Sequence, residues 1–361
     1  NINMAYTDID DPSAYFQTAL FTGNAGTNAI TNTGNSDLQP DWVWFKCRSA
    51  AEHHGLFDSV RGVTKVIYSN LTNAEDNLSD TVASFNSDGF TMGADSGSGG
   101  SFNGSGKTMA AWQWKAGTSF TNDASGTGIG SIDSAGSVNT DAGFSIVSWT
   151  GTGSAGTIKH GLSTTPSMII IKNRSSAYDW TVGHNSLGWT NVVFLNLDTA
   201  SQGDTQFNNT APTSSVFSIG TPLMANKSGD SIIAYCFSEK KGYSKFSSYI
   251  GNGSTDGTFV YTGFKPAFLI VKKTDSVNSW VMFDNKRSSS GGSNEIDYSL
   301  TANEADAEET GTTSSDVDFC SNGVKIREDN GGVNASGGSY IYMAFAENPF
   351  VTSTGVPATA R

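Results

Sequence analysis

The sequence predicts an all-β protein made of three tandem β-sandwich-like modules, of jelly-roll or lectin-like type, each about 100 residues long. Three observations lead to this prediction. One strand pattern recurs three times, short runs of β-branched and aromatic residues alternate with Gly, Asn and Asp turns, and helical periodicity is nearly absent.

The repeated pattern is a proline followed by five mostly apolar residues and a lysine, at 40–46, 166–172 and 266–272. These runs lack polar alternation, so both faces of each strand should be buried, as in a central strand. The shared lysines are expected to cap the strands with a snorkelling ammonium group rather than to act in catalysis. They are Lys46, Lys172 and Lys272.

Each run has the same sequence neighbours. An aromatic residue and a glycine turn precede it at 21–23, 149–151 and 249–251, and a closing strand follows at 111–114, 234–237 and 342–345. One module is therefore written three times, and a threefold β repeat favours a surface-building protein over a single catalytic cleft. Positions shared by the copies should be scaffold, and function is expected where the copies differ.

The repeat sets the expected domain boundaries. They are a docking segment at 1–14, β module 1 at 15–117, a linker at 118–143, β module 2 at 144–246, β module 3 at 247–350 and a C-terminal tail at 351–361. The linker is assigned because that stretch is rich in Gly, Ser, Thr and Asn.

Composition and charge limit the classes of partner that the protein could bind. Charged residues make up 15% of the chain, against about 25% in a typical globular protein, which is typical of secreted, virion or adhesin-like β proteins. A net charge of −13 disfavours nucleic acid. The longest apolar runs are about five residues, far below the roughly 20 that span a bilayer, and no signal peptide is recognisable, so no membrane insertion is expected.

Cysteine usage predicts buried free thiols. Cys47, Cys236 and Cys320 are odd in number and form no zinc pattern. A bridge between Cys236 and Cys320 remains open.

Residues suited to catalysis do not form a plausible active site. Asp58 and Asp284 hold equivalent positions after a strand, where copy two has His184. A position that alternates between Asp and His in separate modules does not describe a glycosidase pair. No HExxH or nucleophile elbow is present either, so no catalytic residue and no enzyme activity are predicted.

Tryptophans could stack on sugars, but the repeat favours core packing. Trp42, Trp44, Trp112 and Trp114 align with aliphatic or other aromatic residues of the other copies. Aromatic residues without counterparts are the better ligand-binding candidates, namely Tyr178 and Trp189 in copy two and Tyr243 at its exit.

The acidic N-terminal stretch offers a weak metal alternative. Asp8, Asp10 and Asp11 could hold a structural Ca²⁺, whereas the other acidic loops lack the dense spacing of a calcium loop. No other cofactor is expected.

Several segments of the chain carry a family resemblance. They include LFDSVRGVTK at 56–65 and SFNSDGF at 84–90, with further segments at 4–7, 15–16, 209–217, 242–246, 248–254 and 334–347. These segments resemble an uncharacterised repeat-domain family of tailed bacteriophages of marine bacteria. Family members are described as virion structural, tail-fibre-like or receptor-binding proteins. The resemblance covers nearly the whole chain and implies a particle component without catalytic residues to transfer.

The resulting expectation is a non-enzymatic virion structural protein on the particle surface, tail-fibre-like in adhesion to host-receptor glycans. The chain has no coiled coil or tail-attachment domain of a long fibre, which raises capsid decoration or appendage assembly as the alternative. A polysaccharide depolymerase is less favoured. Expected partners are other virion proteins, sister subunits in a homo-oligomer with a trimer favoured, and host surface glycans.

Overall fold

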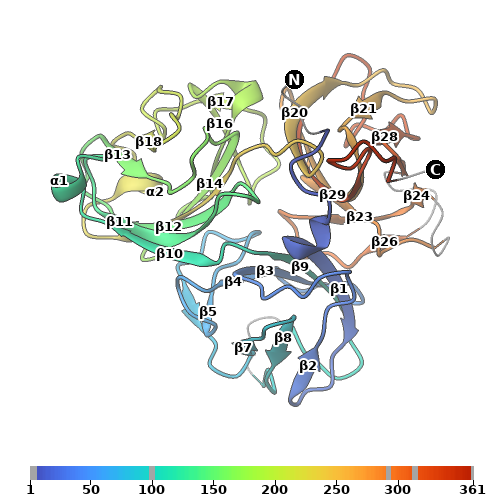
Figure 1. The fold of residues 1–361 in the computed structure, drawn as a ribbon, viewed down its shortest axis with the longest axis horizontal. Coiled ribbons are helices and arrows are strands. Elements are labelled where there is room, and N and C mark those ends of the chain that lie inside the picture. Colours follow the sequence, from blue (N-terminus) through green and yellow to red (C-terminus); the bar gives the residue numbers. More distant parts are fainter. Residues whose placement is uncertain (1–5, 97–101, 290–293, 311–315, 359–361) are drawn as a thin grey trace.

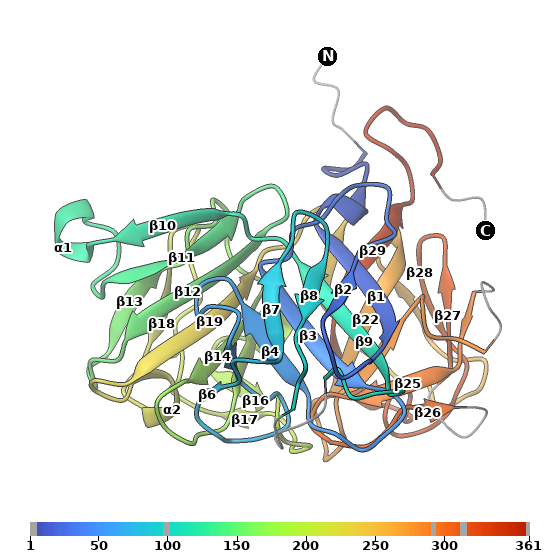
Figure 2. The same ribbon diagram turned by 90° about the horizontal axis from the view of Figure 1, so that it is seen from below.

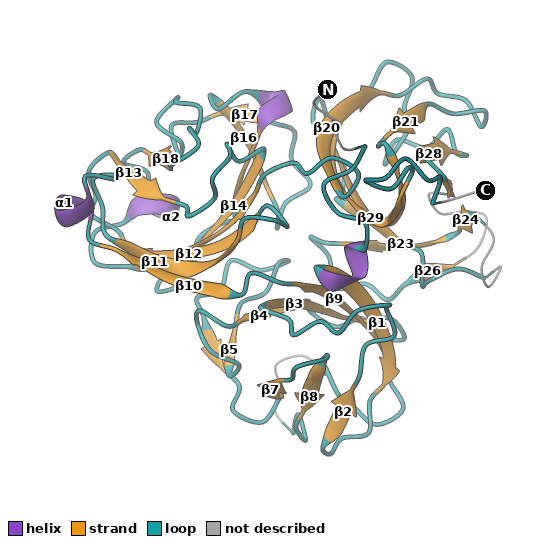
Figure 3. Ribbon diagram, in the orientation of Figure 1, coloured by secondary structure: helices purple, strands orange, loops and turns teal. Residues whose placement is uncertain are grey.

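The computed structural model describes residues 6–96, 102–289, 294–310 and 316–358. About 42% of the chain is strand and 4% is helix, which confirms the all-β prediction. The helical elements are single turns (Figure 3). They are η1 (Pro12–Ala14), α1 (Ala124–Thr127), η2 (Asn185–Leu187) and α2 (Leu223–Asn226).

The first sheet has the strand order β1-β9-β3-β4. Its strands are β1 (Phe16–Thr22), β9 (Thr108–Trp114), β3 (Trp42–Cys47) and β4 (Gly55–Asp58). A three-stranded sheet and a two-stranded ribbon accompany it. They consist of β2 (Asn28–Ile30), β8 (Phe90–Met92) and β7 (Val82–Phe85), and of β5 (Lys65–Val66) and β6 (Asp76–Asn77).

The second sheet has eight strands in the order β10-β11-β12-β19-β14-β15-β16-β17. They are β10 (Thr118–Asn122), β11 (Ser134–Asn139), β12 (Phe144–Thr150), β19 (Ser231–Phe237), β14 (Met168–Asn173), β15 (Thr181–His184), β16 (Asn191–Phe194) and β17 (Gln202–Gly203). A separate pair joins β13 (Gly156–Lys159) to β18 (Val216–Ile219).

The third sheet has the order β20-β29-β22-β23-β25-β26. Its strands are β20 (Ser244–Ile250), β29 (Ser339–Pro349), β22 (Phe264–Lys273), β23 (Val281–Asp284), β25 (Tyr298–Thr301) and β26 (Glu309–Thr310). A four-stranded sheet lies beside it. It contains β21 (Phe259–Tyr261), β28 (Gly323–Ile326), β27 (Val317–Cys320) and β24 (Glu295–Ile296).

One four-strand order is common to the three main sheets. In each, the strand that comes first along the chain pairs with the strand that comes last, and the proline-led strand lies on the other side of that last strand. The orders are β1-β9-β3-β4, β12-β19-β14-β15 and β20-β29-β22-β23. The register agrees as well. Trp42 pairs with Trp114, Met168 with Phe237 and Phe268 with Phe345.

The proline-led strands are buried on both faces, as predicted. All six residues of β3 and of β14 are buried. One face of each main sheet packs on its own small sheet and forms a separate hydrophobic core. The opposite faces of the three main sheets are turned toward one another and share a central core (Figure 1).

An asparagine with matching hydrogen bonds fixes one loop cluster beside each main sheet. Asn226 accepts a hydrogen bond from Thr152 N and donates to Ser154 O and Gly220 O. Asn103 beside the first main sheet and Asn334 beside the third make the matching contacts. Each of these side chains is fully buried.

The predicted linker at 118–143 is wrong as a description of that stretch. It forms β10, α1 and β11, and β11 pairs with β12 along six residues, so the second sheet is extended (Figure 2). The Gly, Ser and Thr composition hid the strands because edge positions of β10 are exposed and need no apolar alternation.

Both terminal segments pack on the body of the protein where they are described. Thr7 Oγ1 donates to Lys241 O at 2.9 Å, and the Ile9 side chain enters the central core. Ser353 N donates to Asp10 at 2.6 Å. The expected loose tail at 351–361 therefore folds back on the N-terminal segment over its described residues, up to 358.

Candidate functional site

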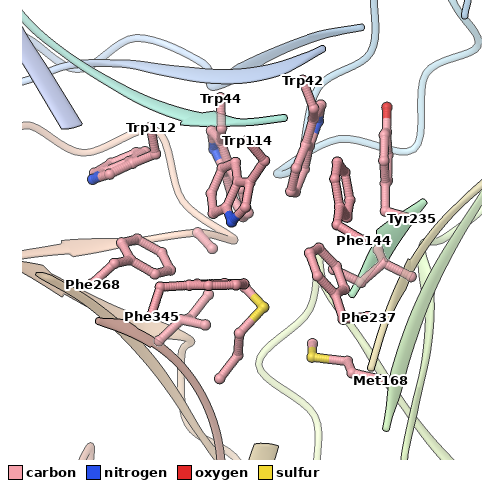
Figure 4. Packing of buried hydrophobic residues seen from close by; sticks show 14 of the residues in the cluster. Trp42, Trp44, Trp112, Trp114, Phe144, Met168, Tyr235, Phe237, Phe268 and Phe345 are labelled. Carbon is pink, nitrogen blue, oxygen red and sulfur yellow. The ribbon is translucent and has the colours of Figure 1, made fainter. Parts of the chain in front are cut away.

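The central core is rich in aromatic rings. The ring of Trp42 lies 4.4 Å from that of Trp114 and 4.4 Å from that of Tyr235, which belongs to the second sheet. Phe237 and Phe345 join the second and third sheets at 6.0 Å. Figure 4 shows these rings converging from three directions. The four tryptophans of the first sheet are fully buried, so their assignment to core is confirmed.

Three buried lysines cross-link the sheets through backbone carbonyls. Each ammonium group donates to a carbonyl six residues further on and to a carbonyl of a neighbouring stretch. The pairs are Lys46 with Glu52 and Ala305, Lys172 with Tyr178 and Thr72, and Lys272 with Asn278 and Asp198, at 2.5–3.1 Å. These contacts run in one direction around the molecule. The lysine of the first sheet reaches the stretch of chain around the third sheet, that of the second reaches the first, and that of the third reaches the second.

The predicted snorkelling of these lysines is wrong, because all three are fully buried. Burial lowers the pKa of Lys172 to about 7 and of Lys46 and Lys272 to about 8. Each ammonium is nevertheless surrounded by carbonyl oxygens, which favour its charged form. Because each ammonium group is bound by backbone carbonyls, we interpret the three lysines as structural residues.

The residue eight positions after each lysine donates a ring N–H to a backbone carbonyl of the same neighbouring stretch that the lysine reaches. Trp180 Nε1 donates to Tyr68 O at 2.8 Å, and Trp280 Nε1 donates to Phe194 O at 2.8 Å. The first stretch has His54 there. Its Nδ1 accepts from Trp44 Nε1, which leaves Nε2–H to donate to Thr301 O at 2.9 Å.

A second set of contacts runs around the core in the opposite sense. Asp58 accepts from Arg61 Nε at 2.5 Å and from the Tyr235 hydroxyl at 2.7 Å. Asp284 likewise accepts from Arg287 Nε at 2.5 Å and from Trp112 Nε1 at 2.9 Å. Both carboxylates and both guanidinium groups are fully buried.

His184 completes this set with different chemistry. It faces the third sheet, where the residue matching Tyr235 and Trp112 is Met343, which has no polar hydrogen. Leu187 stands where Arg61 and Arg287 stand. His184 Nε2 donates instead to Tyr342 O at 3.3 Å. An aspartate would be a buried charge without partners, so the Asp-to-His change follows the neighbours.

Two glutamates extend the charged contacts outward. Glu75 bridges Arg61 and Arg174 at 3.3 and 2.8 Å. Glu308 bridges Arg287 and Arg48 at 3.0 and 2.7 Å. The third junction is uncharged at this place, because Ser201 donates to Thr274 O. The junctions between first and second and between third and first stretches are thus ionic, and the remaining one is neutral.

The aromatic residues predicted to bind a ligand do not form one site. Trp189 is 8% exposed and packs edge-on against Phe207 at 5.1 Å. Tyr243 is 1% exposed and packs against Phe345. Neither can offer a ring face to a glycan, because its neighbours cover it. Tyr178 is partly buried, and Lys227 lies 5.9 Å from its ring.

The acidic N-terminal residues hold separate partners. Asp10 accepts from Ser353, Asp11 accepts from Ser13 and Ser36, and Asp8 accepts from Lys241 N. Among the described residues no group of three His, Cys, Asp or Glu side chains could hold a metal ion. The calcium hypothesis therefore has no geometric support.

Histidines and thiols are likewise committed to packing. His160 is buried, and desolvation lowers its pKa to about 4, as it does for His184. The three cysteines are free; Cys47 and Cys236 are buried as predicted, but Cys320 is only partly buried, so the prediction of a buried thiol is wrong there. Cys236 is fully buried, and burial raises the pKa of its thiol far above the ordinary value. None of these groups is arranged as a nucleophile with a base.

Two surface features were missed by sequence reasoning. Exposed Tyr6, Tyr261 and Phe350 line a cavity of about 330 Å³ between the terminal segments and β20. A second cavity of about 230 Å³ lies between the first and third sheets, next to Thr18. A comparison of residue 18 with its counterparts in the repeat was the available signal for the second cavity.

The fold and these contacts define an all-β protein whose buried ionisable groups join sheets. The chain belongs to the family described as a domain of unknown function (DUF7483), whose model matches residues 11–349. No curated protein and no solved structure matches the chain. Within the described residues, the helices are all too short to cross a bilayer.

Proposed function

We propose that the chain is a non-enzymatic structural component of the surface of a tailed-phage particle, built from three copies of one β-sandwich-like unit locked in a ring. One observation carries this proposal. The buried groups that could perform chemistry, such as Asp58, Asp284, His54 and His184, are spent on contacts between sheets.

The three-copy organisation is supported by pairing and by contact direction. A shared strand order could arise by chance in one pair of sheets, but the lysine contacts and the Asp/His contacts both repeat around all three junctions. Cyclic, head-to-tail contacts of this kind close a ring. The expected homotrimer is then not needed to cover these faces, since one chain supplies all three.

The particle assignment rests on the resemblance of the sequence segments. Two of those segments contain residues of the buried contacts. LFDSVRGVTK holds Asp58 and Arg61, and the stretch 334–347 holds Asn334 and Met343. The resemblance therefore includes residues that hold the body together, which suits a family that shares a rigid body.

Adhesion to host glycans is the role we propose for this body. A rigid core carrying Gly, Ser and Asn-rich loops is a common arrangement for recognition. Decoration or appendage assembly is the second candidate. It is favoured by the cavity of exposed Tyr6, Tyr261 and Phe350, because exposed aromatic residues at a terminus are typical of protein docking faces.

The test is to locate the chain in a particle. Antibodies raised against the purified protein should label intact particles at a fixed surface position, and the chain should be found by mass spectrometry in particles purified by density. Its absence from such particles would overturn the proposal. Release of reducing sugar from host polysaccharide by the purified protein would instead support the depolymerase reading.

A further inference from the structure

One position inside the ring breaks the repeat. The register places Thr18 on β1 opposite Trp112, Ile146 on β12 opposite Tyr235 and Phe246 on β20 opposite Met343. Ile146 and Phe246 are large, apolar and part of the central core. Thr18 is the small, polar member of the set, so the first sheet leaves space where the others are filled.

The space is the cavity of about 230 Å³ between the first and third sheets. Phe16, Ala267 and Ala346 form an apolar floor and are almost fully buried. Asn285, Lys286 and Asn348 of the third stretch line it, and Thr33 and Asn35 line it from the first. At the other two junctions, Ile146 and Phe246 occupy the matching place.

Thr18 sets the size of the cavity. The residue is 8% exposed, and its hydroxyl oxygen is sealed from solvent and has no hydrogen-bond partner within the described protein. A buried hydroxyl without a partner destabilises the fold, and replacement by Ile would remove that destabilisation. The polar groups available to an occupant therefore belong to the residues around Thr18, among them Asn285 and Asn348.

The lining indicates the class of occupant. A cavity of about 150 Å³ already accepts benzene, so this one has room for a single six-membered ring with substituents. An apolar floor beneath amides and hydroxyls matches the apolar face and hydroxyl edge of a pyranose. The volume is below the roughly 300 Å³ at which pockets for drug-sized molecules begin, which excludes extended ligands from full burial.

We propose that this cavity binds one sugar ring, which lies on the apolar floor and is hydrogen-bonded by the three asparagines of the polar wall. The proposal rests on the adhesive role proposed above and gives it a site and a ligand class. The ring would be the terminal residue of a longer glycan, because the mouth opens to solvent beside exposed Lys286.

Saturation-transfer difference NMR tests the proposal on the full chain. The probes are D-glucose, D-galactose, D-mannose and N-acetyl-D-glucosamine, each added alone. We expect at least one probe to receive saturation from the wild-type protein. Thr18→Ile should abolish that signal, because the new side chain fills the cavity as Ile146 fills its counterpart. Asn285→Ala should weaken it while leaving the cavity open.

The control is Thr118→Ile, the same change on an exposed position of β10, and it should keep the signal. Thr18→Ile should fold with an unchanged or higher melting temperature, so loss of signal cannot be ascribed to unfolding. A wild-type protein silent toward all four sugars, or a signal that survives Thr18→Ile, overturns the sugar site. Either outcome leaves the location of the chain on the particle to its own test.

Discussion

The indole nitrogen of Trp112 donates a hydrogen bond of 2.9 Å to Asp284, across 172 positions of the sequence. The same pair of positions joins Asp58 to Tyr235 at 2.7 Å. The acceptors and donors lie on different sheets in both cases. Each buried carboxylate also accepts from an arginine three residues further on. Its set of hydrogen bonds is completed when the next sheet docks, which couples the folding of neighbouring sheets.

Removal of one buried cation should destabilise the whole ring. Arg287→Met leaves the Asp284 carboxylate buried without its guanidinium partner, so we expect the free energy of unfolding in urea to fall by about 3–5 kcal/mol. The control is Arg327→Met. Arg327 is 48% exposed in its pair with Asp318, and loss of an exposed pair should cost about 0–1 kcal/mol. Equal effects of the two changes would contradict the structural role assigned to Arg287.

The neutral junction should accept the ionic set only as a whole. His184→Asp alone buries a carboxylate beside Leu187 and Met343 and should cost about 3–5 kcal/mol. Addition of Leu187→Arg and Met343→Tyr supplies the partners that Asp58 has in Arg61 and Tyr235. The triple variant should therefore recover most of the lost stability in the same urea titration. A triple variant no more stable than His184→Asp would disprove the positional equivalence.

The buried asparagine of each loop cluster should be worth far more than a surface asparagine. Asn226→Ala removes a side chain bonded to three backbone groups, and each buried group left unpaired costs about 1–3 kcal/mol. We expect the melting temperature to fall by several degrees and expect Asn103→Ala and Asn334→Ala to behave alike. Asn73→Ala, at an exposed position, should leave it unchanged. Widely different losses among the three buried positions would argue against their equivalence.

Acid should weaken the fold through its buried histidines. Burial lowers the pKa of His160 and of His184 to about 4 in the folded state, below the unfolded value of about 6.5. Between these values the unfolded chain binds more protons, so stability falls as pH drops from about 6.5 to 4. By about pH 4, each histidine has lowered the free energy of unfolding by about 3 kcal/mol.

His184→Gln removes one of these titrations and isolates its share. Urea titrations at a series of pH values should show a shallower acid limb for the variant than for the wild-type protein. An identical slope between pH 6.5 and pH 4 would mean that His184 does not titrate differently in the folded and unfolded states.

Much of the scaffold could be predicted from the sequence because its signal is local. The proline-led strands show their burial in five consecutive apolar residues, and the alignment of Trp42 with Met168 and Phe268 agrees with the strand register. What buries the second face of these strands could not be predicted. That depends on the other two sheets, and no local pattern in one strand names its distant neighbours.

The candidate sites were harder to predict for a related reason. Trp189 and Tyr243 have no counterparts in the repeat, but unmatched aromatic residues can still be covered by residues such as Phe207 and Phe345. Thr18 was recognisable in principle, since it departs from Ile146 and Phe246. The sequence alone could not show that Thr18 lines a cavity, because that cavity lies between β1 and the third sheet.

Differential scanning calorimetry of the wild-type protein and Arg287→Met tests the ring most directly. If the three sheets close on one another through shared buried groups, the chain should melt in a single transition, and the substitution should shift that transition as a whole. Separate transitions, of which only one moves in the Arg287→Met protein, would contradict the cyclic interlock of the three sheets.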